Sequence, residues 1–387
     1  MKLANNLQRL GTETAFKVLA EAKKLEASGR KIIHLGLGQP DFKTPKHIVD
    51  AAKKALDEGH HGYVLSNGIL ECRQAVTRKI KKLYNKEVDP ERVLIMPGGK
   101  PTMYYAITCF GEPEAEIIHP TPGFPIYESM INYTGSKSVP YDLTKDKNLK
   151  FNPKEILSLI NDKTRLLIII NPNNPTGSFV EKSSIDILAE GLKKYPHVTI
   201  LSDEIYSRQI FDDKEMPTFF NYPELQNRLI VLDGWSKAYA MTGWRMGWSV
   251  WPENLIPHVN KLLINSVSCV NAPSQFAGIA ALDGPDDSIY LMMEKFDERR
   301  KLIHKGLNNL PGVECSLPGG AFYAFPNVKG TGMNGEEFAK KCLQEAGVAI
   351  VPGTSFGKTS EDYVRFSFAA SKENISDAIE KIGKMLR

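Results

Sequence analysis

The sequence predicts an α/β protein in which helices cover both faces of a mainly parallel sheet, followed by a smaller α+β domain. Two observations predict this fold class. Short apolar runs alternate with longer helical stretches over most of the chain, which is typical of a buried parallel sheet. Beyond about residue 283 the pattern changes to one of mixed strands and helices. With 387 residues the chain is long enough for about two to three domains.

The elements of the large sheet region follow from the spacing of the apolar residues. Amphipathic helices, in which apolar residues recur with the helical period, are expected at 16–27, 48–56, 70–83 and 102–109. Short apolar runs are expected to form strands at Ile32–Gly38, Val93–Met96, Ala115–His119, Leu166–Ile170, Val198–Leu201 and Leu229–Leu232.

The C-terminal region is expected to begin with a long charged helix at 289–310. Strands are expected at 321–325, 348–351 and 363–368, and a closing helix at 375–386. Gly284-Pro285 is the expected boundary between the domains. The predicted division is therefore an N-terminal arm with the start of the small domain at 1–45, the large domain at 46–284, and the small C-terminal domain at 285–387.

Composition and charge exclude several classes of protein. The 49 basic and 45 acidic residues are interspersed, so neither nucleic acid nor a membrane surface is indicated as a partner. No apolar run approaches the roughly 18 residues of a membrane-spanning helix, and residues 1–16 lack the apolar core of a signal peptide. The five cysteines include no CxxC pair, and His60-His61 has no metal-ligand spacing with another histidine. We expect a cytoplasmic protein without a metal site.

Lys237 is the most informative single residue. It follows the apolar run Leu229–Leu232, so a buried strand delivers it. A lysine held among apolar and cationic neighbours loses its proton more easily than an exposed one, and it can then condense with an aldehyde or ketone. Arg245 follows after a Thr-Gly break and is placed to hold a phosphate near the same point. A reactive amine beside a phosphate clamp indicates pyridoxal phosphate. The alternative is a solvated surface lysine.

Other polar residues follow two further strands. The run Leu166–Ile170 leads into a turn that contains Asn174, and Val198–Leu201 leads to Asp203 and Tyr206. Ligands of open α/β sheets bind beyond the carboxyl ends of the strands, so we expect these groups to meet one ligand with Lys237. Each has a plainer alternative, because asparagine often shapes its own turn and aspartate often caps the next helix.

A glycine-rich turn follows the strand at Val93–Met96. Gly98 and Gly99 leave backbone N–H groups free to meet a phosphate at the start of the next helix, where Pro101 suits the first turn. A plain tight turn is the alternative. The GxGxxG run at 330–335 lacks an acidic residue about 20 positions on, so it is expected to be a loop and not a dinucleotide site.

Several segments, taken in order, resemble the signature of the fold-type I pyridoxal phosphate aminotransferases, in the bacterial branch close to aspartate aminotransferase. The resemblance extends from about residue 10 to the C-terminus. It rests on the runs GLGQPDF at 36–42, NPNNPTG at 171–177, SDEIY at 202–206, SKAYAMTGWR at 236–245 and RFS at 365–367.

The resemblance implies a role for each matching residue. It implies that Lys237 carries pyridoxal 5'-phosphate as a Schiff base, and that Asp203 pairs with the pyridine nitrogen so that the ring can accept electrons. Arg365 is implied to bind the substrate α-carboxylate, near Gly38 and Asn174. The other implied cofactor contacts are Tyr206 and Asn174 at the phenolic oxygen, Phe124 against the ring, Gly98, Gly99, Lys100 and Arg245 at the phosphate, and Tyr63 from a second subunit. Many relatives have a phosphate-binding serine where this chain has Gly234, and Ser236 is the candidate to replace it.

The resemblance also implies an activity: a homodimeric aminotransferase of amino acid metabolism and biosynthesis, which moves an amino group between an L-amino acid and a 2-oxo acid by a ping-pong mechanism. Lys100 indicates an acidic donor, aspartate or glutamate, because relatives use a lysine there for a distal carboxylate. Its alternative role is a phosphate contact. Aromatic or other neutral donors, and a C–S β-lyase with the same cofactor, are the alternative functions. A non-catalytic ligand sensor is disfavoured, because no basic helix-turn-helix extension is present.

Overall fold

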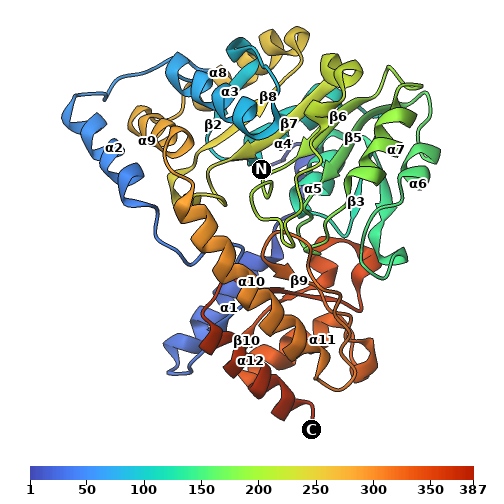
Figure 1. Ribbon diagram of the computed structural model, residues 1–387. Coiled ribbons are helices and arrows are strands. Elements are labelled where there is room, and N and C mark those ends of the chain that lie inside the picture. The colour runs from blue at the N-terminus through green and yellow to red at the C-terminus, as the bar shows by residue number, and fades with distance from the viewer.

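The computed structural model describes residues 1–387, and its largest sheet has seven strands in the order β2-β8-β7-β6-β5-β3-β4 (Figure 1). Only β8 runs antiparallel to its neighbours; the other strands are parallel to one another. In chain order, the strands of this sheet are β2 (Val93–Met96), β3 (Glu116–Thr121), β4 (Lys137–Asp142), β5 (Thr164–Ile170), β6 (Thr199–Asp203), β7 (Leu229–Gly234) and β8 (Gly247–Val250).

Helices surround this sheet and continue into the lower part of the molecule in Figure 1. The α-helices are α1 (Thr14–Ala27), α2 (Lys46–Asp57), α3 (Leu70–Tyr84), α4 (Lys100–Phe110), α5 (Pro125–Thr134), α6 (Pro153–Ser158), α7 (Lys182–Leu192), α8 (Ile256–Val267), α9 (Ala272–Asp283), α10 (Asp287–Asn308), α11 (Gly335–Lys341) and α12 (Lys372–Met385). Short helical turns lie at η1 (Asn5–Arg9), η2 (Pro90–Arg92), η3 (Leu143–Lys145), η4 (Phe219–Asn221), η5 (Pro223–Arg228), η6 (Thr242–Trp244), η7 (Glu253–Leu255), η8 (Lys329–Thr331), η9 (Cys342–Ala346), η10 (Gly353–Phe356) and η11 (Lys358–Ser360).

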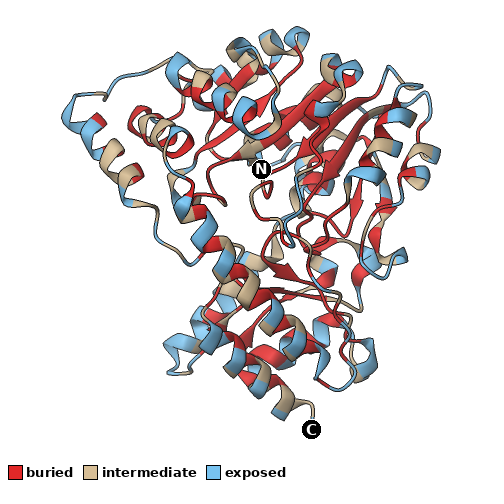
Figure 2. Cartoon of the chain, viewed as in Figure 1, coloured by how far each residue is buried: buried red, intermediate tan, exposed pale blue.

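Most strands of the large sheet are buried on both faces, because their side chains are apolar on both sides. Along β5, Leu167 and Ile169 pack into a core of 44 buried residues, whereas Leu166, Ile168 and Ile170 pack into a separate core of 19. Successive side chains of a strand point to opposite faces, so a continuous apolar run is what a doubly covered strand requires. Figure 2 shows the strands in the colour of buried residues and the outer sides of the helices as exposed.

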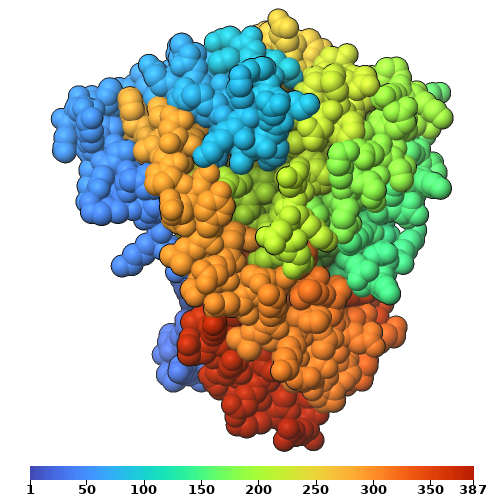
Figure 3. Space-filling model, viewed as in Figure 1, coloured from blue at the N-terminus to red at the C-terminus, as the bar shows by residue number.

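A third core of 29 buried residues belongs mainly to the C-terminal region. There, β11 (Val351–Pro352), β12 (Val364–Ser367) and β9 (Tyr323–Ala324) form an antiparallel sheet, and β1 (Ile33–His34) pairs in parallel with β10 (Val348–Ala349). In Figure 3 the blue N-terminal segment accordingly lies beside the orange and red C-terminal region. Residues from both ends of the chain thus build one smaller unit, which α10 joins to the large sheet (Figure 1).

The predicted fold class is confirmed, with differences in individual elements. The strand predicted at Ile32–Gly38 is wrong in length, since β1 spans only Ile33–His34 and the Gly36 carbonyl bonds to a side chain, that of Arg365, and not to another strand. The strand predicted at 348–351 is two strands in different sheets. The bounds of α5, α6, α7, α8, α9, α11, β4 and β8 were not predicted. The three-part domain division stays a prediction; its boundary falls between α9 and α10.

No helix of the structure is both long and apolar enough to cross a membrane. No group of three or more His, Cys, Asp or Glu side chains is arranged to hold a metal ion.

The central strand β6 offers a test of the doubly buried sheet. Leu201→Ala removes a fully buried side chain and should lower the free energy of unfolding by about 2–5 kcal/mol, because it leaves a cavity. Ile187→Ala, at an exposed position on α7, is the matched control and should change it by about 0.5 kcal/mol or less. Denaturant unfolding of both variants measures the difference, and equal effects would contradict the assignment of β6 to the core.

Candidate active site

A cavity of about 450 Å³ lies beyond the carboxyl ends of β5, β6 and β7. Parallel strands end at the same edge of a sheet, so residues that are distant in sequence meet there. Arg365 reaches the cavity from β12, and Gly38 from the loop after β1. Eleven of the thirteen predicted site residues line it: Gly38, Gly99, Lys100, Phe124, Asn174, Asp203, Tyr206, Ser236, Lys237, Arg245 and Arg365.

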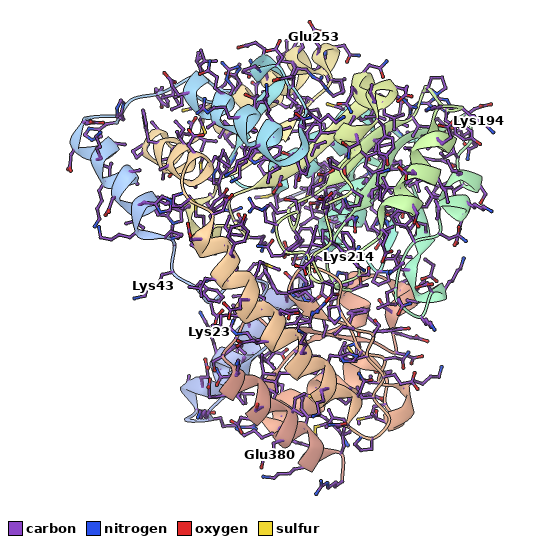
Figure 4. The ribbon with its side chains drawn as sticks, in the orientation of Figure 1. Lys23, Lys43, Lys194, Lys214, Glu253 and Glu380 are labelled. Atoms are coloured by element: carbon purple, nitrogen blue, oxygen red, sulfur yellow. The ribbon has the colours of Figure 1, made fainter.

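The Lys237 side chain is enclosed by backbone and aromatic groups. Its Nζ donates a hydrogen bond of 2.6 Å to the Gly38 carbonyl oxygen and lies 5.7 Å from the ring centroids of Tyr206 and Phe322. Burial, reinforced by the positive charges of Arg365 and Arg245, lowers the pKa of Lys237 to about 8. Unlike the buried Lys237 amine, charged side chains such as Lys194, Glu253 and Glu380 project from the outside of the molecule (Figure 4). The amine of Lys237 is therefore poised to become a nucleophile.

Asp203 is a fully enclosed carboxylate at the end of β6. The Tyr127 hydroxyl donates to its Oδ2 at 2.7 Å, and the Ile205 N–H donates to its Oδ1 at 3.2 Å. Burial raises the pKa of Asp203 to about 6. A carboxylate in this position favours a cationic group in the cavity. Sequence reasoning missed Tyr127, which lies on the unpredicted helix α5.

Arg365 is buried, and not all of its hydrogen-bond donors have a partner. Its Nη1 donates to Asn174 Oδ1 at 2.8 Å and its Nη2 to the Gly36 carbonyl oxygen at 2.7 Å, while Nε has no hydrogen-bond partner. The guanidinium carbon lies 4.6 Å from the ring centroids of both Tyr323 and Phe356. A buried guanidinium with an unpaired donor suits a carboxylate ligand.

Tyr323 is a second residue that sequence reasoning missed. Its hydroxyl and that of Tyr206 share a hydrogen bond of 2.7 Å, and its ring lies against Arg365. It comes from the short strand β9, whose sequence carries no motif. A Cβ at Gly38 would overlap the Tyr323 hydroxyl, so glycine is needed for the Gly38 backbone to approach Lys237.

One corner of the site has the features of an anion site. Gly98 has a φ of +87°, and a Cβ there would overlap the Arg245 guanidinium. Gly99 caps α4 without a side-chain hydrogen bond, and the N–H groups of Gly99 and Lys100 have no backbone partner, whereas Pro101 has no N–H and the Thr102 N–H donates to the Gly99 carbonyl oxygen at 3.1 Å. Arg245 donates from Nη1 to the Thr242 carbonyl oxygen at 2.7 Å. Gly98 does not line the cavity itself but allows Arg245 to lie against the turn.

The close pairing of two strands explains why glycine stands at position 234. Gly234 pairs with Gly247 across β7 and β8, and a Cβ at Gly234 would lie 2.9 Å from the Gly247 Cα. A serine at this position would therefore force the two strands apart. Ser236 is buried and lines the cavity, where it offers a hydroxyl.

Lys100 and Tyr63 are placed differently from the other predicted residues. The Lys100 ammonium forms an ion pair with the carboxylate of Glu13, a residue that the sequence did not single out. Lys100 Nζ also lies 5.9 Å from the ring centroids of Phe16 and Phe124. Tyr63 lies outside the cavity with 92% of its surface exposed.

Comparison with known proteins identifies the family. The family model described as "Aminotransferase class I and II" matches residues 30–382. The chain belongs to this aminotransferase family. The aminotransferase is 39% identical to a Pyrococcus horikoshii protein named aspartate aminotransferase, over 96% of this chain and 93% of that protein.

Solved structures agree with this assignment. The structure of an aspartate aminotransferase from Rhizobium meliloti matches the aminotransferase with a TM-score of 0.95 and 30% identity, over 100% of this chain and 99% of that one. An aromatic aminotransferase from Pyrococcus horikoshii matches with a TM-score of 0.88 and 34% identity, over 95% and 98% of the two chains. Relatives with different named substrates are thus similarly close to this chain.

Class I and II aminotransferases use pyridoxal 5'-phosphate, and the residues of this aminotransferase fit that group. The nucleophilic amine of Lys237 suits its aldehyde, the buried carboxylate of Asp203 suits its pyridine nitrogen, and the glycine turn beside Arg245 suits its phosphate. Arg365 keeps an unpaired donor for a substrate carboxylate.

The lowered pKa of Lys237 is testable in the cofactor-free enzyme. Trace labelling with acetic anhydride across pH should reach half of its maximum at Lys237 near pH 8, because the amine is protonated and unreactive below its pKa. An ordinary lysine, such as added Nα-acetyl-lysine amide, should reach it near about pH 10.4. Peptide mass spectrometry measures both, and coincident curves would contradict the desolvated amine.

Proposed function

We propose that this aminotransferase moves an amino group from an L-amino acid to a 2-oxo acid by a ping-pong mechanism in which Lys237 carries the proton. One observation supports the proposal above all: Lys237, Asp203 and Arg365 meet in one cavity that also contains an anion corner. An amine, a carboxylate and a guanidinium there supply a proton carrier, an electrostatic partner for the cofactor and a carboxylate clamp.

Some of these residues bind the substrate, and others bind the cofactor. Arg365 binds the α-carboxylate, and its unpaired Nε supplies a further donor for it. Gly38 flanks the same position through its backbone. Asn174 serves both ligands, because its Oδ1 accepts from Arg365 while its amide nitrogen is left to donate to the cofactor's phenolic oxygen, as does Tyr206.

When bound, pyridoxal 5'-phosphate supplies a ring that accepts the electrons left by loss of the α-proton. Asp203 would stabilise the positive charge on its pyridine nitrogen, and Phe124 would pack on its ring. The backbone at Gly98 and Gly99, with Ser236 and Arg245, would hold its phosphate, and Lys100 would contact either this phosphate or a distal substrate carboxylate. Lys237 would hold its aldehyde carbon, and the freed amine would take the proton from the substrate Cα and deliver it to that carbon.

We also propose a homodimer in which Tyr63 contacts the phosphate of the cofactor that is bound in the second subunit. Tyr63 does not line the cavity of its own chain. It stands among exposed large apolar side chains, since Leu56 and Leu65 are also exposed. Apolar side chains gathered on a surface mark an interaction site.

Two classes of amino donor, which differ in the charge of their side chain, are candidates. An acidic donor is predicted from Lys100, which lines the cavity and carries the charge that a distal carboxylate needs. A neutral or aromatic donor is favoured by the apolar walls that Phe16, Leu19 and Met103 provide.

Replacing Lys237 tests the proposed reaction. Lys237→Ala should lower the rate of single-turnover conversion of an amino acid by about 10³-fold or more, because proton transfer loses its carrier. The parent enzyme should give parallel double-reciprocal plots, as ping-pong kinetics require. Lys194→Ala, on the surface, is the control. Transamination by Lys237→Ala at the parent rate would refute the assignment, and release of ammonia and pyruvate from cystathionine without a 2-oxo acid would favour a β-lyase.

Replacing Lys100 tests the acidic donor. If Lys100 binds a distal carboxylate, Lys100→Ala should raise the KM for aspartate far more than that for alanine, since only aspartate has the second carboxylate. Steady-state kinetics with the two donors measure the ratio. Equal effects would rule out the acidic donor and leave Lys100 with the phosphate.

A further inference from the structure

We propose that Glu13 sets the substrate class of this enzyme by opposing a distal carboxylate, so that amino acids with neutral side chains are the preferred donors. The proposal rests on the proposed transamination and concerns only its specificity. It follows from the position of Glu13, from the way the chain holds it there, and from the balance of charges in the cavity.

Glu13 lies inside the cavity and not on the surface of the molecule. It precedes the first turn of α1, its side chain is only 15% exposed, and its carboxylate pairs with the Lys100 ammonium. Lys100 is the cation that the sequence assigns to a distal carboxylate. In this structure that cation already has a carboxylate partner, which the chain itself supplies.

The backbone before Glu13 is tied to the large sheet region. Arg9 donates from Nε to the Asn132 carbonyl oxygen at 2.8 Å and from Nη2 to the Tyr133 carbonyl oxygen at 2.9 Å, both on α5. The Gly11 N–H donates to Ser129 Oγ, also on α5, at 2.9 Å. After Glu13, α1 packs against β10 and β11. Glu13 is thus held on both sides and acts as a fixed counter-ion.

The remaining cations of the cavity are committed to other groups. Arg365 faces the α-carboxylate position, and Arg245 faces the anion corner. A second substrate carboxylate would therefore have to share Lys100 with Glu13. Two carboxylates beside one ammonium repel each other; the Lys100 side chain is 46% exposed, so solvent moderates this repulsion. The pair of Glu13 and Lys100 is nearly neutral overall, so it does not disfavour an uncharged side chain.

Apolar surroundings support the same conclusion. Lys100 Nζ lies 5.9 Å from the ring centroids of Phe16, which is partly exposed, and Phe124. Leu19 and Leu37 add apolar surface to the same cavity. Such walls favour an apolar or aromatic side chain over a strongly hydrated one.

The test uses the holoenzyme and the variant Glu13→Gln, which removes the charge but keeps the shape of the side chain. We expect maleate, a non-reacting dicarboxylate, to bind about tenfold more tightly to Glu13→Gln than to the parent, because Lys100 is released. The kcat/KM for aspartate relative to phenylalanine should rise by a similar factor. Binding of 3-phenylpropionate, which has one carboxylate, should tighten much less, because Glu13 is ion-paired with Lys100 and acts on Arg365 and Lys237 through its charge alone. Calorimetric titration and steady-state kinetics measure these quantities.

Two further variants make the result specific. Glu21→Gln removes an exposed charge from the same helix and should leave all the ratios unchanged. In the double variant Glu13→Gln/Lys100→Gln the gain for maleate should disappear, because it depends on the freed ammonium.

The outcomes separate this proposal from the proposed function. Unchanged maleate binding in Glu13→Gln, or weaker binding, would overturn the role of Glu13. A gain that survives in the double variant would overturn it as well. Absence of turnover with every amino acid would overturn the proposed transamination, whereas the ratio of maleate dissociation constants would still decide the role of Glu13.

Discussion

The site depends on the desolvation of one amine beside two guanidinium groups. Burial and the charges of Arg365 and Arg245 bring the pKa of Lys237 down to about 8, which makes its amine a nucleophile and a base near neutral pH. The same enclosure raises the pKa of Asp203, so the carboxylate benefits from a cationic partner. Each group is unfavourable when buried alone. Together they form a site that a cofactor with an aldehyde, a basic ring nitrogen and a phosphate completes.

The arrangement of the chain explains how these groups are brought together. Strands β5, β6 and β7 end at one edge of the large sheet and deliver Asn174, Asp203 and Lys237. The smaller unit, built from both ends of the chain, supplies the other wall with Gly38 and Arg365. The N-terminal segment then spans the two, since η1 contacts α5 while α1 contacts β10 and β11. Glu13 lies at this junction, so the segment that closes the cavity also carries the charge that we propose selects its substrates.

Much of the fold and half of the 22 residues that line the cavity were predicted, some from local signals in the sequence and others, such as Arg365 and Phe124, from the family resemblance. Lys237, Asp203 and Asn174 each follow a recognisable apolar strand, and parallel strands place their ends together without any long-range information. Tyr127, Tyr323 and Glu13 have no such signal. Tyr323 lies in a strand of only two residues, and Glu13 gains its importance only because Arg9 and Gly11 dock on α5. Such contacts between distant segments are decided by tertiary packing.

The elements that were missed have related causes. Strand β8 has four residues that include a glycine, and its neighbours hold it in place. Strand β4 lies at the edge of the sheet, buries only Tyr141 and contains a proline, which weakens the apolar pattern. Strand β1 is short because, after Leu35, which still bonds to Ala349 and Ser367, the carbonyl oxygens of Gly36 and Gly38 accept from Arg365 and Lys237 and not from a strand. In each case a tertiary contact outweighed local propensity.

Locating the covalent bond to the cofactor tests the role of Lys237 directly. The enzyme with bound pyridoxal 5'-phosphate is reduced with borohydride and digested, and the peptides are analysed by mass spectrometry. We predict that the mass of the reduced cofactor is found on Lys237 and on no other lysine. Attachment at a different lysine, or stable binding of the cofactor without any covalent bond, would contradict it.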